Sequence, residues 1–196
     1  MTSSAPRGAA FPLGSLPTRE FRGTLSRCVP YPDFASGDPP RFFFVSGNAN
    51  RLNPEGVRCL YLSEEERIAD AEYGGYWQGL PSAHQPKLTF HVRVELANVL
   101  DLAMPEVLDA LGLREADLFG TWRLSPVTTR LQALGKAIAG QTRIVAVRYP
   151  STAARSLSPP GYNLAVFVTS LKAPDRLEVL GKHGKVLETL PEESQS

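Results

Sequence analysis

One glutamate of the sequence lies where a charged side chain is costly. A helix is predicted to run to Tyr73, and Ile68 and Ala69 precede Glu72 by four and three residues, which places them on one face. A carboxylate on an apolar face needs a partner or a catalytic task, because an unpaired buried charge is unfavourable. Glu72 is therefore the first candidate functional residue. The alternative is a side chain at the edge of that face which reaches water.

Three further side chains could bind a polar or charged ligand. Arg51 lies in a turn-rich loop, where its guanidinium could present a bidentate fork to phosphate or carboxylate. Tyr61 lies in a predicted strand, and Ser151 follows Tyr149 and Pro150 in a predicted turn. Taken singly, each has an ordinary structural explanation as well: a solvated loop arginine, a core aromatic and a turn serine.

The segments that must position these residues follow from hydrophobic patterning and turn signals. A strand over residues 57–62 would place Tyr61 on the same face as Val57 and Cys59. Ser63 and Glu66 have the spacing of a capping box, which would begin the helix bearing Glu72. Gly74 and Gly75 are expected to end that helix after Tyr73.

The rest of the chain predicts a single α+β domain over residues 19–190, with a mixed or antiparallel sheet and flanking helices. Residues 87–96 alternate apolar and polar side chains and give the clearest strand. Further strands are predicted over residues 41–45, 143–149, 162–171, 176–180 and 186–190, and helices over 105–112 and 125–140. Residues 1–18 and 191–196 are expected to be flexible tails.

Composition narrows the class of protein. Its 196 residues carry 21 Lys and Arg against 20 Asp and Glu, which disfavours a general nucleic-acid or membrane-surface binder. No apolar run approaches the length of a membrane span, and the N-terminus has no signal-peptide pattern. Cys28 and Cys59, with three scattered histidines, make neither a disulfide framework nor a zinc site. We therefore expect a cytoplasmic protein with no metal centre.

Residues 50–63 together with residues 71–73 resemble the core signature of the RES domain family, which is named for an arginine, a glutamate and a serine. Arg51 precedes Tyr61 by ten residues and Tyr61 precedes Glu72 by eleven, which is similar to the spacing in that family. Residues 21–23, around Arg22, resemble an aromatic–arginine pair near the start of the domain. Residues 149–151 resemble the segment that supplies the serine, and residues 163–167 resemble a late strand that contains an asparagine.

The resemblance implies a fold similar to that of ADP-ribosyltransferase toxins, with NAD as a substrate and no resident cofactor. It also implies a toxin whose partner is an Xre-type antitoxin, so that the two form a hetero-oligomer. The implied chemistries are NAD phosphorolysis, NAD hydrolysis and ADP-ribosylation of a cytoplasmic protein. All three begin by breaking the bond between nicotinamide and ribose.

The same resemblance assigns roles to the candidate residues. Glu72, Arg51 and Tyr61 would be catalytic, with Glu72 stabilising the positive charge that develops on the ribose. Arg51 and Arg22 would bind the pyrophosphate, Tyr61 would stack on nicotinamide, and Ser151 would donate a hydrogen bond to the substrate. The alternatives are a transferase that modifies one protein, an inactive RES-like module that only binds a partner, and a structural interaction domain.

Overall fold

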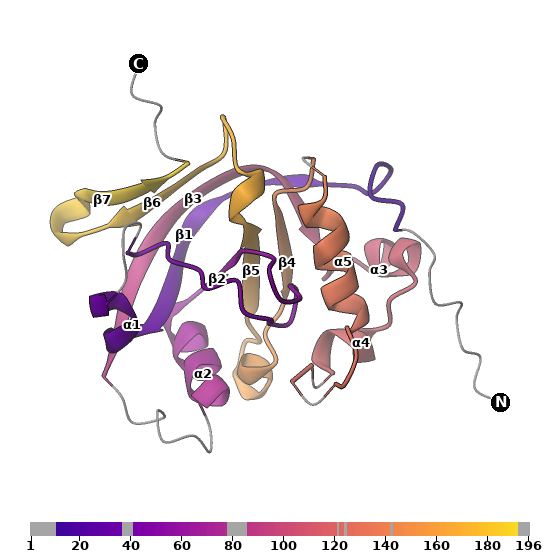
Figure 1. Ribbon diagram of the computed structural model, residues 1–196, viewed down its shortest axis with the longest axis horizontal. Coiled ribbons are helices and arrows are strands. Elements are labelled where there is room, and N and C mark those ends of the chain that lie inside the picture. The colour runs from indigo at the N-terminus through magenta and orange to yellow at the C-terminus, as the bar shows by residue number, and fades with distance from the viewer. Residues whose placement is uncertain are drawn as a thin grey trace.

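The computed structural model describes residues 11–36, 41–77, 86–120, 122–123, 125–141 and 143–191. Seven strands form one strongly bent sheet, with helices packed at one end and along one side (Figure 1). The strands are β1 (Arg19–Pro30), β2 (Cys59–Ser63), β3 (Lys87–Asp101), β4 (Ala146–Pro150), β5 (Tyr162–Phe167), β6 (Arg176–Leu180) and β7 (Val186–Leu190). The helices are α1 (Tyr31–Ser36), α2 (Glu66–Trp77), α3 (Pro105–Leu111), α4 (Glu115–Phe119) and α5 (Arg130–Ala139).

The strand order is β1-β2-β5-β4-β3-β6-β7, and β1 also pairs with β3. All pairings are antiparallel except that of β3 with β4. Strand β3 pairs with β1 from Lys87 to Val99, with β6 at His91–Glu95 and with β4 at Val99–Asp101. The sheet therefore bends around on itself, and the prediction of an α+β domain with a mixed sheet and flanking helices is confirmed.

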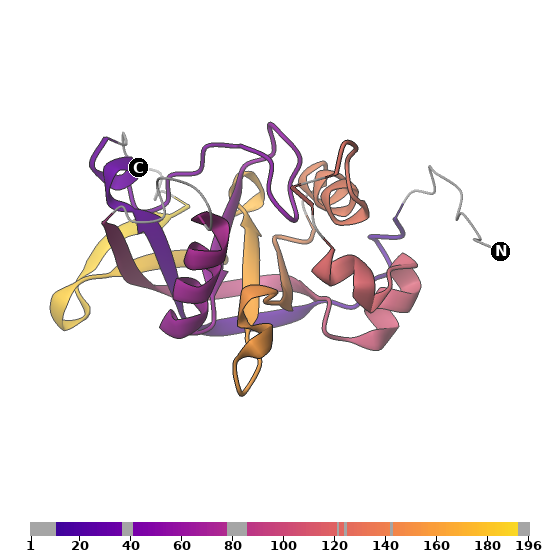
Figure 2. The same cartoon turned by 90° about the horizontal axis from the view of Figure 1, so that it is seen from below.

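The central strands β2, β5 and β4 separate two hydrophobic cores. On one face, Cys59, Tyr149 and Phe167 belong to a core that also contains Leu134 and Ile138 of α5. On the other face, the alternate residues of the same strands pack against β1, β3 and β6; they include Leu60, Leu62, Ala146, Leu164 and Val166. Seen from below (Figure 2), α3, α4 and α5 gather at one end of the sheet, and the β6–β7 hairpin lies at the other.

The junction between β2 and α2 differs from the prediction. Ser63 is the last residue of β2 and not the N-cap of the helix, because its hydroxyl donates to Asn163 Oδ1 at 2.7 Å and its backbone pairs in the sheet. Helix α2 begins at Glu66 and continues through Gly74 and Gly75 to Trp77. Glycine weakens a helix by only about 1 kcal/mol, so contacts elsewhere on α2 carry it past both glycines.

Residues 41–45 form a loop and not the predicted strand. Arg27 of β1 donates to the carbonyl oxygens of Phe42 at 2.9 Å and Phe44 at 2.7 Å. The carboxylate of Glu188 in β7 accepts from the backbone N–H groups of Phe42 at 3.3 Å and Phe43 at 2.9 Å. Side chains thus supply the hydrogen bonds that a neighbouring strand would otherwise supply, while Phe43 stays buried in the core.

The predicted N-terminal tail is wrong for residues 11–18. Leu16 is 1% exposed and belongs to the core, and Phe11 and Leu13 pack against it. Arg143 donates to the carbonyl oxygens of Leu13 at 2.9 Å and Leu16 at 3.0 Å, which holds this segment on the domain. The remaining parts of the two predicted tails, residues 1–10 and 192–196, lie outside the described residues. Of the helices described, none combines the length and apolarity needed to cross a membrane.

Candidate active site

A cleft of about 960 Å³ opens between β1, the loop over residues 41–58, helix α2 and the segment that follows β4. Arg51, Tyr61 and Glu72 all line it, although the chain between the first and last of them passes through a loop, a strand and a helix. The structure thus brings together the three residues that the sequence predicted to share one site.

Glu72 is held inside this cleft by two hydrogen bonds. Its Oε1 accepts from Ser151 Oγ at 2.6 Å and from Asn163 Nδ2 at 2.7 Å. Ser63, Asn163 and Tyr149 are direct neighbours across β2, β5 and β4, so they form one row on the floor of the cleft. Because Ser63 donates to Asn163 Oδ1, the amide of Asn163 presents its NH₂ group to Glu72. Two donors therefore hold the same carboxylate oxygen and fix its direction.

Ser151 positions Glu72 in this arrangement. The serine is 2% exposed, its Oγ accepts from the backbone N–H of Ala154 at 3.0 Å, and its hydrogen is donated to Glu72. The sequence predicted a serine that donates to the substrate. The structure instead shows the hydroxyl donating to Glu72. Asn163 donates to the same carboxylate oxygen, although the sequence indicated Asn163 only as part of a strand that resembles one in the family.

Tyr149 and Tyr61 also line the cleft, and both stay neutral over a wide pH range. Burial raises the pKa of Tyr149 well above its usual value, and the charge of Glu72 raises it further, against the opposing effects of Arg51 and Asn163. Burial likewise raises the pKa of Tyr61. Tyr149 was considered in the sequence only as the neighbour of Ser151, because an aromatic residue in a strand is typical of any core.

The Tyr61 hydroxyl anchors the loop that carries Arg51. It donates to Asn53 Oδ1 at 2.7 Å and accepts from the backbone N–H of Leu52 at 3.0 Å. Arg51 Nη1 donates to the carbonyl oxygens of Leu118 at 2.9 Å and Gly120 at 3.0 Å, at the end of α4. Within the part of the chain that the structure describes, the hydrogen bonds of this guanidinium all use Nη1. The rest of the fork can therefore bind a ligand in the cleft.

Arg22 is placed apart from this site. Its side chain is 72% exposed and lies 3.7 Å from Glu20, and it is not among the described residues that line the cleft. Other arginines line the cleft instead: Arg27, Arg41 and Arg123 together with Arg51. Burial lowers the pKa of Arg27 to about 10 against the opposing charge of Glu188, so Arg27 is still a cation at neutral pH. Nothing in residue type or spacing distinguishes these arginines from solvated ones.

The charges on the cleft lining favour an anionic ligand. The four arginines face two acids of the described lining, Asp33 and Glu72. A guanidinium cluster in a partly enclosed cleft attracts phosphate groups, and a single well-held carboxylate in the same cleft can stabilise a developing cation. The fold and the site thus define a single-domain α+β protein with a cleft that is lined by arginines and contains one oriented acid.

Comparison with known proteins agrees with this class. The family model described as the RES domain matches residues 29–187, and the chain belongs to that family. One solved structure with a similar fold is that of the M. tuberculosis MbcT–MbcA toxin–antitoxin complex, with 18% sequence identity and a TM-score of 0.59. That match covers 88% of this chain and 85% of the other, and at this identity the likeness is one of fold. No curated protein matches the chain.

Proposed function

We propose that the protein is an NAD-consuming enzyme that cleaves the bond between nicotinamide and ribose, and that it acts as the toxin of a toxin–antitoxin pair. The observation that carries the proposal is the Glu72 carboxylate, held by Ser151 and Asn163 inside a cleft lined by arginines. Membership of the RES domain family supports the same class of substrate.

The chemistry of this cleavage fits the residues of the cleft. Loss of nicotinamide builds positive charge on the ribose, as in glycoside hydrolysis, and a preorganised carboxylate stabilises that charge. Nicotinamide in NAD is already a good leaving group, so no general acid is needed. Arg51 would bind the pyrophosphate with the part of its fork that faces the cleft, and the ring of Tyr61 would contact the flat nicotinamide cation.

The reaction is tested by incubating the purified protein with NAD labelled in its ADP-ribose half. Release of nicotinamide with free ADP-ribose would identify a hydrolase, and ADP-ribose-1″-phosphate in phosphate buffer would identify a phosphorylase. Label on a protein added from a cell extract would instead identify an ADP-ribosyltransferase. NAD that stays intact under all three conditions would reject the proposal and favour a module that only binds a partner.

Replacing Arg51 by alanine should raise the KM for NAD by about tenfold or more and lower kcat less. The pyrophosphate is present in the ground state and the transition state alike, so its binding contributes mainly to KM. Arg22→Ala is the matched control, because it removes the same charge outside the cleft, and it should leave both constants unchanged. An equal effect of the two substitutions would show that net charge matters and not the Arg51 contact.

We further propose an Xre-type antitoxin as the partner, which would form a hetero-oligomer with this protein. An acidic segment of that partner could enter the cleft and pair with Arg41, Arg51 and Arg123, in place of the pyrophosphate. The structural neighbour supports this partner because it was solved in complex with its antitoxin. A saturating amount of the cognate partner should therefore block NAD turnover and lose that effect in high salt. Undiminished turnover would contradict the proposal.

A further inference from the structure

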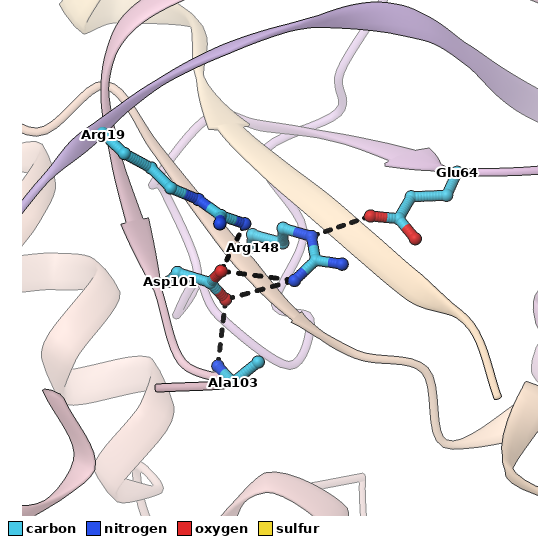
Figure 3. Close-up of polar contacts among 5 residues, drawn as sticks. All are labelled: Arg19, Glu64, Asp101, Ala103 and Arg148. Carbon is cyan, nitrogen blue, oxygen red and sulfur yellow. Dashed lines mark hydrogen bonds and ion pairs between the residues drawn. The ribbon is translucent and has the colours of Figure 1, made fainter. Parts of the chain in front are cut away.

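A partly buried ion network joins Arg148 to acids from two other segments of the chain (Figure 3). Arg148 of β4 donates from Nε to Glu64 Oε1 at 2.7 Å and from Nη1 to Asp101 Oδ2 at 3.2 Å. Asp101 is 3% exposed, accepts from the backbone N–H of Ala103 at 3.0 Å, and forms an ion pair with Arg19. The Arg148 guanidinium also lies 3.6 Å from the ring centroid of Tyr162. The network thus joins β1, β3, β4 and β5 to the segment between β2 and α2.

This network occupies the opposite face of the strands that form the floor of the cleft. Side chains alternate along a strand, so Arg148 points away from the face that carries its neighbour Tyr149. Tyr162 likewise points away from the face that carries Asn163, and Glu64 follows Ser63 at the end of β2. Each residue of the row Ser63–Asn163–Tyr149 therefore has a chain neighbour that takes part in the Arg148 contacts on the opposite face.

We infer that the ion pair between Glu64 and Arg148, the pin, fixes the position of Glu72 from the opposite face of the sheet. Both are positioning residues for the reaction proposed above. Glu64 lies between the last residue of β2 and the first residue of α2, the helix that carries Glu72. Its backbone N–H donates to the Tyr162 carbonyl at 3.1 Å, so its main chain is bound to β5 and its side chain to β4. The inference rests on the proposed function.

The pin supplies a restraint that the strand pairing lacks. Beyond Ser63 only the backbone hydrogen bond from Glu64 to Tyr162 continues the strand pairing, so a tilt of α2 about this corner would leave β2 paired. Such a tilt would move Glu72 away from Ser151 and Asn163, which belong to β4–β5 and the turn beside them. The Glu64–Arg148 pair links the corner to those same strands, so Glu72 keeps its two donors at 2.6 and 2.7 Å.

The inference is tested by comparing Glu64→Ala with Glu64→Gln and with Glu65→Ala. Glu64→Ala removes the pin, and we expect kcat for NAD to fall about 10- to 100-fold, because misplacement by about 1 Å is that costly. The KM should change less than about twofold, since the arginines of the cleft are untouched. Glu64→Gln retains an acceptor for Arg148 Nε and should recover most of kcat. Glu65→Ala removes the neighbouring exposed acid, which contacts only Arg67 among the described residues, and should match the parent.

The results of these measurements distinguish a positioning role for Glu64 from a purely structural one. A folded Glu64→Ala protein with the kcat of the parent would overturn the inference, and so would equal losses in Glu64→Ala and Glu65→Ala. If the parent does not consume NAD, the proposed function fails and crystal structures decide the positioning role. In the Glu64→Ala structure, the contact between Glu72 Oε1 and Ser151 Oγ should then lengthen beyond hydrogen-bond distance, and an unchanged contact would overturn the inference.

Discussion

Replacement of Glu72 by glutamine should leave the protein folded and reduce NAD turnover by about 10²- to 10³-fold, or roughly 3–4 kcal/mol in activation free energy. Glutamine keeps an oxygen that can accept from Ser151 and Asn163, so the local hydrogen bonds survive. The substitution removes the negative charge that would face the ribosyl cation. The measurement is a kinetic comparison with a thermal melt of each protein.

Glu66→Gln is the matched control for this prediction. Glu66 is exposed at the first residue of the same helix, and its substitution makes the same change in charge. It should leave turnover within about twofold of the parent, and the Tm should change little. If folded Glu72→Gln turns over NAD within about threefold of the parent, a change of only ~0.65 kcal/mol, Glu72 is not the carboxylate that stabilises the transition state.

Replacement of Gly135 by alanine should strongly destabilise the protein and impair NAD binding together. Gly135 is buried in α5, and a Cβ there would lie 1.5 Å from the carbonyl oxygen of Leu52, the residue after Arg51. Since the clash is with backbone, the Arg51 loop or the helix must move. We expect a loss of about 3 kcal/mol or more, a Tm lower by about 6–12 °C, and a higher KM for NAD.

Gly74→Ala makes the same chemical change at a position where the added Cβ has room. Gly74 lies inside α2, and a Cβ there would meet nothing within 4 Å. Alanine should therefore stabilise the helix by about 0.5–1 kcal/mol and raise the Tm slightly. If both alanine variants shifted the Tm in the same direction and by a similar amount, close approach of the Leu52 backbone would not explain why position 135 needs glycine.

Much of the fold could be predicted because hydrophobic periodicity reports directly on burial. Helix α3 follows its predicted segment, with Gly112 at its end in the left-handed conformation. Strand β3 begins at Lys87 as predicted but continues past residue 96 to Asp101. Strand β1 was missed because its buried and exposed residues do not alternate and its pairing with β3 contains an irregularity after Arg19. The loop over residues 41–45 was predicted as a strand because its apolar side chains match one, whereas Arg27 and Glu188 decide its backbone conformation.

A residue of the candidate site could be predicted where its type is unusual for the environment that the sequence pattern indicates. Glu72 on an apolar helix face is such a case, and the structure places it in the cleft with Arg51 and Tyr61. Arg27 was not predictable, because its importance depends on which loop passes over β1, and that contact joins residues far apart in the chain. Arg22, which resembled the expected motif more closely, lies on the surface.

Arg27 and Glu188 hold the loop over residues 41–45 through its main chain and not through its side chains. Both side chains bind main-chain atoms of Phe42, Phe43 and Phe44, which every amino acid except proline offers alike. The exposed side chains of Arg41 and Phe44 line the cleft and take no part in this anchoring. These two positions of the cleft lining can therefore be varied, to fit another ligand or partner, while the path of the loop backbone stays the same.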